Sequence, residues 1–166
     1  MATPTTLPAT FVSGAVLTAA QMNDLRGAFR ILQVVNAKTS TAASSSVQTY
    51  ADTNLTATIT PSSTSSKILV FVSQNGLYKT SGAGNAVNLK LLRAGTGITN
   101  VAVELGYSPT AQEMILGSTS TCYLDSPATT SATIYKTQFA NRVTAASVSV
   151  QINSAESTIT LMEISA

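Results

Sequence analysis

Two glutamates, Glu104 and Glu113, come nearest to the spacing of a catalytic pair. They flank one predicted turn, so their carboxylates can approach each other, and glycoside hydrolysis needs two carboxylates about 5–10 Å apart. No aromatic-rich segment that could stack on a sugar accompanies them, since aromatic residues make up 5% of the chain. We interpret both glutamates as solvated charges at loop edges. A small carbohydrate-active enzyme is therefore the weakest of the candidate functions.

The remaining residue types do not supply a catalytic or metal-binding set. The chain has no histidine and one cysteine, Cys122, which excludes a Ser-His-Asp triad, a Cys-His pair and an ordinary zinc site. Cys122 lies in the strand-like run TSTCYLD and is predicted to be a small buried thiol. The segments SGAGN and AGTG lie between predicted strands, without the following helix that a phosphate site needs. We expect no enzyme activity, no catalytic residue, no metal and no cofactor.

Composition and charge narrow the range of partners. Charged residues are 10% of the chain, apolar residues are 44% and the formal net charge is +2. The nine basic residues are scattered, so no nucleic-acid-binding stripe is predicted. No segment has the roughly 18 apolar residues of a membrane span, and residues 1–14 do not have the pattern of a secretory signal. We expect a folded protein that binds no nucleic acid and does not insert into a membrane.

The one convincing helix signal lies at residues 17–32 (LTAAQMNDLRGAFRIL). Thr18 and Gln21 have the spacing of a capping box. One apolar stripe then recurs at helical spacing, formed by Met22, Leu25, Phe29 and Leu32. A helix this short is marginal alone in water, so its stripe needs a cover. Three alternatives are open for what covers the stripe: the following domain, copies of the helix or a larger assembly.

Residues 1–14 precede this helix and contain two prolines but no helical or alternating period. Each proline restricts its own backbone and that of the residue before it, so an extended arm is predicted. The arm carries three spaced apolar residues, Leu7, Phe11 and Val12. We expect it to dock on a neighbouring molecule.

Strand candidates fill the chain after a patch of small residues at 40–46. Ile68 to Val72 (ILVFV) is too short for a helix and is predicted to be a strand buried on both faces. Further candidates lie at residues 47–51, 55–59, 86–93, 98–105, 114–116, 119–124, 132–139, 147–153 and 158–164. The prediction is an all-β fold: an antiparallel jelly-roll-like β-sandwich over residues 47–166, after an N-terminal part (1–46) with arm, helix and linker.

The last predicted strand has apolar residues on both faces. Ile159, Leu161 and Glu163 are expected to face one way, and Met162 and Ile164 the other. This pattern suggests a second covered surface, such as an interface between copies.

Three phrases of the sequence resemble one family. LPATFVSGAVLTAAQMNDL is similar to the opening of many tailed-bacteriophage structural proteins, and ITPSSTSSKILV and STITLMEIS resemble phage fibre, head-fibre and tail-tip domains. The resemblance implies a trimeric jelly-roll-like domain at the particle surface, anchored by its N-terminal segment to tail or capsid proteins. The anchoring role then falls on Leu7, Phe11, Val12, Met22, Leu25 and Phe29.

The short length of the chain bears on which kind of phage protein it resembles. Long fibres have a shaft between anchor and knob, and here only residues 31–46 are available for one. A short tail appendage that binds a host receptor and a capsid decoration protein both remain open. A receptor-binding appendage would display exposed loop residues, for which the candidates are Tyr78, Asn85, Tyr107 and Tyr123.

Overall fold

The structure is a computed structural model that describes residues 14, 16, 18, 19, 31–144 and 146–165. From Ile31 onward the described chain consists of strands joined by turns, with one short 3-10 helix. The elements are β1 (Ile31–Thr39), β2 (Ala43–Ser45), β3 (Ala51–Ile59), β4 (Lys67–Lys79), β5 (Val87–Arg93), β6 (Thr96–Leu105), β7 (Met114–Asp125), β8 (Thr133–Asn141), β9 (Val148–Val150), η1 (Ile152–Ser154) and β10 (Ser157–Ile164).

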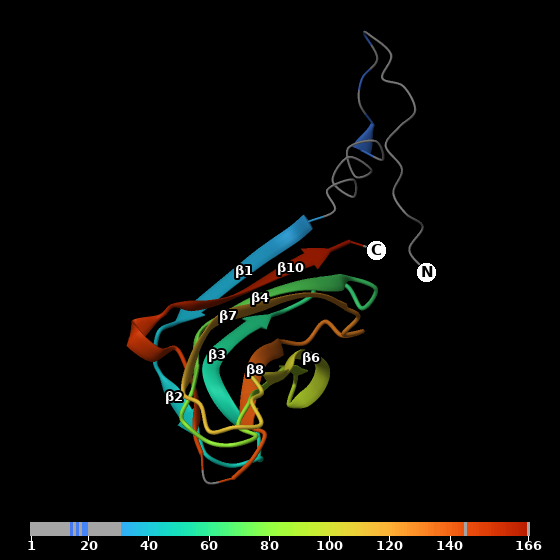
Figure 1. Cartoon of the computed structure of the whole chain (residues 1–166). Coiled ribbons are helices and arrows are strands. Elements are labelled where there is room, and N and C mark those ends of the chain that lie inside the picture. The colour runs from blue at the N-terminus through green and yellow to red at the C-terminus, as the bar shows by residue number, and fades with distance from the viewer. Residues whose placement is uncertain (1–13, 15, 17, 20–30, 145, 166) are drawn as a thin grey trace.

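The strands form two antiparallel sheets. One has the order β1-β10-β4-β9-β2, with β7 paired to β4, and the other has the order β3-β8-β5-β6. Because β7 takes one edge of β4 along Ile68–Lys79, β10 and β9 follow each other along its other edge. Figure 1 shows β1, β10, β4 and β7 side by side in one layer, with β3 and β8 in the other.

This strand order is that of a jelly roll. For this comparison β1 and β2 count together as the first strand, and β9 and β10 count together as the eighth. The order in the first sheet is then first, eighth, third and sixth, where the third is β4 and the sixth is β7. The second sheet holds the second, seventh, fourth and fifth strands. The structure therefore confirms the predicted all-β antiparallel sandwich.

The sandwich begins at Ile31, before the boundary expected at residue 47. Residues 31–39 pair with β10, and residues 43–45 pair with β9. Leu32, predicted as the last residue of the helix, lies in β1, because hydrogen bonding to β10 prevails over the local helical pattern. The rest of the predicted helix and arm lies almost entirely outside the described residues.

Strand β4 corrects a second expectation. Ile68, Val70 and Val72 are buried, but Leu69 is half-buried and Phe71 is 40% exposed, so only one face is covered. Cys122, opposite Phe71 on β7, is exposed rather than buried. The half-buried Tyr123 packs on the core, and alternation along the strand turns Cys122 outward.

The core consists of two apolar clusters. The first contains Leu55, Ile59, Ile68, Val70, Tyr135, Ile159 and Leu161 among others, and the second contains Leu77, Val87, Leu89, Phe139, Val148 and Val150. Burial of their alternating side chains supplies the main stabilisation of the sandwich. The inward-facing Ile159, Leu161 and Glu163 confirm the predicted faces of the last strand.

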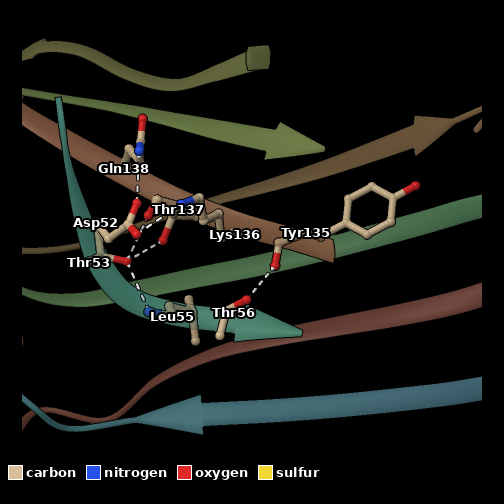
Figure 2. A network of polar contacts seen from close by, with 8 residues as sticks. All are labelled: Asp52, Thr53, Leu55, Thr56, Tyr135, Lys136, Thr137 and Gln138. Atoms are coloured by element: carbon tan, nitrogen blue, oxygen red, sulfur yellow. Dashed lines mark hydrogen bonds and ion pairs between the residues drawn. The ribbon is translucent and has the colours of Figure 1, made fainter. Parts of the chain in front are cut away.

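Buried polar side chains form a chain of hydrogen bonds between the sheets. Thr53 on β3 and Thr137 on β8 share a hydroxyl–hydroxyl hydrogen bond (Figure 2). Thr137 Oγ1 donates to Gln74 Oε1 at 3.0 Å, and Gln74 Nε2 donates to Ser157 Oγ at 3.1 Å. Because such groups are costly to bury unpaired, these bonds favour one register of β3, β8, β4 and β10.

A second set of polar contacts joins the sheets through Asp125 at the end of β7. Asp125 is buried and accepts a hydrogen bond from the Tyr135 hydroxyl at 2.6 Å. Arg93 Nη1 on β5 lies 2.7 Å and 2.8 Å from the two carboxylate oxygens. Burial, together with the hydrogen bond to Asp125, raises the pKa of Tyr135, so its phenol remains a donor.

Glu163, buried on β10, ties the ends of three segments together. Its carboxylate accepts hydrogen bonds from Ser62 N at 2.7 Å, Ser62 Oγ at 2.6 Å and Gln33 Nε2 at 2.5 Å. Burial alone would raise the pKa of Glu163, but these donors outweigh it and hold the pKa below its ordinary value.

Replacing Glu163 with glutamine is therefore expected to weaken the fold in a pH-dependent way. A carboxylate whose pKa is depressed in the folded state stabilises above its unfolded pKa, 4.5 here, and the effect disappears as pH falls through the folded pKa. The variant should lose about 1–3 kcal/mol at neutral pH and converge on the wild type in acid. Urea unfolding at several pH values measures this. A pH-independent difference would contradict it.

Candidate functional site

The end of the sandwich opposite Ile31 and Ile164 carries four connections. Lys79 at the end of β4 pairs with Met114 and Val148, and the Asn141 amide donates to Val47 O. Residues 46–50, 80–86, 106–113 and 142–147 therefore gather here, and we call this region the loop end. In Figure 1 it lies at the bottom, while β1 begins and β10 ends at the top.

Tyr107 is the exposed aromatic residue of the loop end, with 49% of its surface open to solvent. The Arg142 guanidinium lies 4.8 Å from its ring centroid, and Arg142 Nε donates to Glu104 Oε1 at 2.8 Å. The hydrogen bond to Glu104 also raises the pKa of Arg142. The three side chains form an oriented aromatic surface flanked by both charge signs, a type of contact that is common at protein interfaces.

A second tyrosine lies at the same end of the sandwich. The half-buried Tyr78 on β4 donates its hydroxyl to Glu113 at 2.6 Å. This hydrogen bond raises the pKa of Tyr78, so the phenol stays protonated. Glu104 and Glu113, considered above as a catalytic pair, are thus hydrogen-bonded to different partners.

Asn85, which was predicted to face a receptor, does not face solvent. It is buried, and its Nδ2 donates to Thr80 O at 2.9 Å and to Ser147 O at 3.1 Å. The buried Lys79 Nζ donates to Asn85 O at 3.2 Å. Asn85 therefore holds two loops together, a role that a turn-like sequence does not distinguish from exposure.

Tyr123 lies apart from the loop end. It lies near the end of β7, two residues before Asp125, where it is half-buried against the first apolar cluster. Of the four loop candidates, Tyr78, Asn85 and Tyr107 therefore lie at the loop end, and Asn85 is buried there. The six candidate anchoring residues lie outside the described residues.

Sequence reasoning missed the contribution of Arg142. Arg142 and Glu104 are 38 residues apart, and no local pattern links them. The approach is set by the fold: Arg142 N donates to Ala86 O at 3.0 Å, and Gly84 N donates to Ser108 O at 2.8 Å. These backbone bonds fix the relative positions of three loops, so the exposed side chains rest on an ordered base.

No group of three or more His, Cys, Asp or Glu side chains in residues 31–144 and 146–165 is arranged to hold a metal ion. Within the same part of the chain, no helix is long and apolar enough to cross a membrane.

Comparisons with known proteins give likenesses at the level of structure only. No protein-family model matches the chain, and no curated protein matches it. The chain is similar to the crystal structure of the infectious bursal disease virus VP2 subviral particle, with a TM-score of 0.47 and 14% sequence identity. The likeness covers 79% of this chain and 33% of that one, so this chain spans about one third of its length.

Proposed function

We propose that this chain is a non-enzymatic structural protein of a bacteriophage virion. It is a trimeric surface appendage of the tail-fibre or receptor-binding type, attached to the particle through its N-terminal arm and helix. The observation that carries the proposal is the direction of the chain. The N-terminal segment joins the sandwich at Ile31, beside Ile164, and the loop end lies at the opposite end of the strands.

This direction suits an anchored appendage. A molecule held through the segment before Ile31 presents its loop end, with Tyr107 and Arg142, away from the attachment point. Strand β4 has 13 residues, and at about 3.3 Å per residue it holds the loops roughly 40 Å from that point. The resemblance of residues 7–25 to the opening of phage structural proteins supports the same arrangement.

A capsid decoration protein is the second candidate, and one observation favours it. Within residues 31–46, the stretch considered above for a shaft, residues 31–39 and 43–45 are strands of the sandwich itself. The anchor therefore connects directly to the body, which suits a protein that lies against a particle surface. Antibody labelling of intact particles separates the candidates, because decoration gives label over the head and an appendage gives label on the tail only. Absence of label from every particle would contradict both.

The attachment itself is tested by the double substitution Phe11→Ala with Phe29→Ala. Burying two phenylalanines contributes several kcal/mol, so their removal should reduce occupancy in assembled particles at least about tenfold. The sandwich should remain folded, because both residues precede Ile31. Occupancy is measured by quantitative mass spectrometry of purified particles, and folding by circular dichroism.

The matched control is Val103→Ala with Tyr107→Ala, which removes exposed side chains from the body of the sandwich. It should leave occupancy unchanged. Normal occupancy of the Phe11/Phe29 variant would show that attachment does not depend on the N-terminal segment.

A further inference from the structure

We infer that the outer face of the β1-β10-β4-β7 layer is the surface through which three copies of this chain associate, around an axis parallel to the strands. The inference rests on the trimer of the proposed function and names its contact surface. The strand register carries it: Val34 pairs with Met162, Met162 with Leu69, and Leu69 with Leu124. These four residues, here called the apolar row, cross all four strands.

The apolar row is open to solvent on a single chain. Val34 is 54% exposed and Leu124 is 52% exposed, while Met162 and Leu69 are half-buried between them. Leu32 and Phe71, on either side of the row, are 41% and 40% exposed. Contiguous apolar patches of this kind on a soluble protein mark interaction sites, since their burial is favourable.

The other sheet has a different outer face. There Lys136 Nζ lies 2.9 Å from Asp52 Oδ2 (Figure 2), and Lys90 Nζ lies 3.9 Å from the centroid of the Tyr50 ring. Those side chains are solvated and already paired. The apolar row has no charged member, so it provides no basis for selecting a charged partner. A matching neutral, apolar surface satisfies it, and another copy of this chain carries one.

The pattern of rows decides how the copies are arranged. The row next to the apolar row contains Asn36, Thr160, Phe71 and Cys122, and the next contains Lys38, Thr158, Ser73 and Ser120. The face thus changes from apolar to polar along the strands. When copies are related by rotation about an axis parallel to the strands, equivalent rows lie at the same height along that axis. The apolar row of one copy then meets the apolar row of the next. An antiparallel pair brings apolar rows together only when its twofold axis passes through the row itself, and it then sets the polar row of Asn36 and Thr160 against the side of the face that carries Leu32 and Lys67.

A hollow on the same face fits this arrangement. It has a volume of about 380 Å³ and is bordered by Phe71, Cys122, Ser120 and Thr160, among others. Because Phe71 borders the hollow, the two lie at the same height. A neighbouring copy related by the same axis can place its exposed Phe71 ring against this hollow, which gives shape complementarity as well as apolar contact.

The sequence before Ile31 supplies an independent argument. Met22, Leu25 and Phe29 are separated by three and then four residues, the spacing of a coiled-coil seam. This segment joins the sandwich at the end of the face where Leu32 and Val34 lie. An axis through the apolar rows places the three Ile31 residues at one end of the trimer, so three N-terminal segments leave it from the same end and are available to bind the particle as one unit.

Sedimentation equilibrium of the purified full chain tests the inference. The wild type should have three times the mass of one chain, and Val34→Ser with Leu124→Ser should raise the dissociation constant at least about tenfold. Val103→Ser with Ile134→Ser is the matched control: it removes exposed apolar groups from the other sheet and should leave the trimer intact. Circular dichroism of each variant checks that it is folded.

Cys122 gives a second readout, since it is the single cysteine and lies on this face. Its reaction with a maleimide should be slow in the trimer and fast in the Val34/Leu124 variant. A wild type of single-chain mass at about 100 µM overturns the inference, as does a Val34/Leu124 variant that remains trimeric. A monomer with a protected Cys122 would instead mean that the chain's own N-terminal segment covers the face. In each of these cases, loss of particle attachment in the Phe11/Phe29 variant would still support attachment through the N-terminal segment, whereas a monomeric wild type would contradict the trimeric form of the proposed function.

Discussion

Replacing Asp125 with alanine is expected to lower the free energy of unfolding by about 3 kcal/mol, which corresponds to a melting temperature lower by about 6–12 °C. The substitution leaves the buried Tyr135 hydroxyl without its acceptor and removes the carboxylate that holds Arg93. The cost is that of unpaired polar groups in a region closed to water, and it exceeds the small net contribution of an exposed ion pair.

The control is Asp52→Ala, which removes another carboxylate–cation pair of similar geometry. Asp52 lies 2.9 Å from Lys136 but has half of its side chain exposed, so its loss should cost less than about 1 kcal/mol. Chemical denaturation of both variants at one protein concentration measures the difference. Equal losses would mean that burial of Asp125 does not govern its contribution.

Much of the fold was predictable because its strands follow simple alternation. The patterns at residues 86–93, 98–105 and 158–164 correspond closely to β5, β6 and β10. The predicted breaks between strands were less reliable than the strands themselves. The sequence predicts two strands at residues 114–116 and 119–124, yet β7 is one strand that continues through an irregularity in its pairing at Gly117. A glycine in a strand reads as a turn, but in a paired strand it accommodates a bulge.

The edges of the sandwich were not readable from local sequence. Strand β1 depends on its pairing with β10, at the far end of the chain, whereas its first residues complete a helical stripe. Likewise, ILVFV appears buried on both faces because nothing in the run indicates that one face lacks a cover within the sandwich. The exposed Phe71 and Cys122 follow from the position of the strands, not from their composition.

The candidate site was predictable only in part, for a related reason. A tyrosine in a loop is a reasonable surface candidate, and Tyr107 is exposed. Asn85 has the same local appearance but satisfies two backbone carbonyls inside the loop end. Whether a polar side chain faces outward depends on contacts between loops distant in sequence, which single-sequence patterns do not contain.

The fold does not choose the function. Jelly rolls occur in viral capsids, lectins and cupins, so the sandwich by itself is compatible with structural, binding and catalytic proteins. The proposal depends instead on the opposite positions of the chain's entry at Ile31 and the loop end, and on the unpaired apolar row beside that entry. These features belong to this particular sequence and not to jelly rolls in general. Substitutions at the surface can change each of them without altering the core.

Gly76→Ala is expected to be the most damaging single-methyl substitution in β4, with a loss of about 3 kcal/mol or more. Gly76 has φ +61° at an irregularity of β4, between Gln74 and Leu77, where the strand passes η1. An added Cβ would lie 2.7 Å from Ile152 N, 2.8 Å from Ala155 Cβ and 2.9 Å from Ile152 O. Since two of these atoms are backbone, relief requires movement of η1.

Gly117→Ala on β7 isolates that steric effect. Gly117 pairs with Leu77 and has φ +76°, but an added Cβ there has no atom within 4 Å. Its substitution carries only the backbone strain of a left-handed residue, about 1 kcal/mol. Denaturation midpoints should therefore separate the two variants clearly. If both lost the same amount, backbone conformation rather than the approach of η1 would account for the glycine at position 76, and β4 could move away from η1 at little cost.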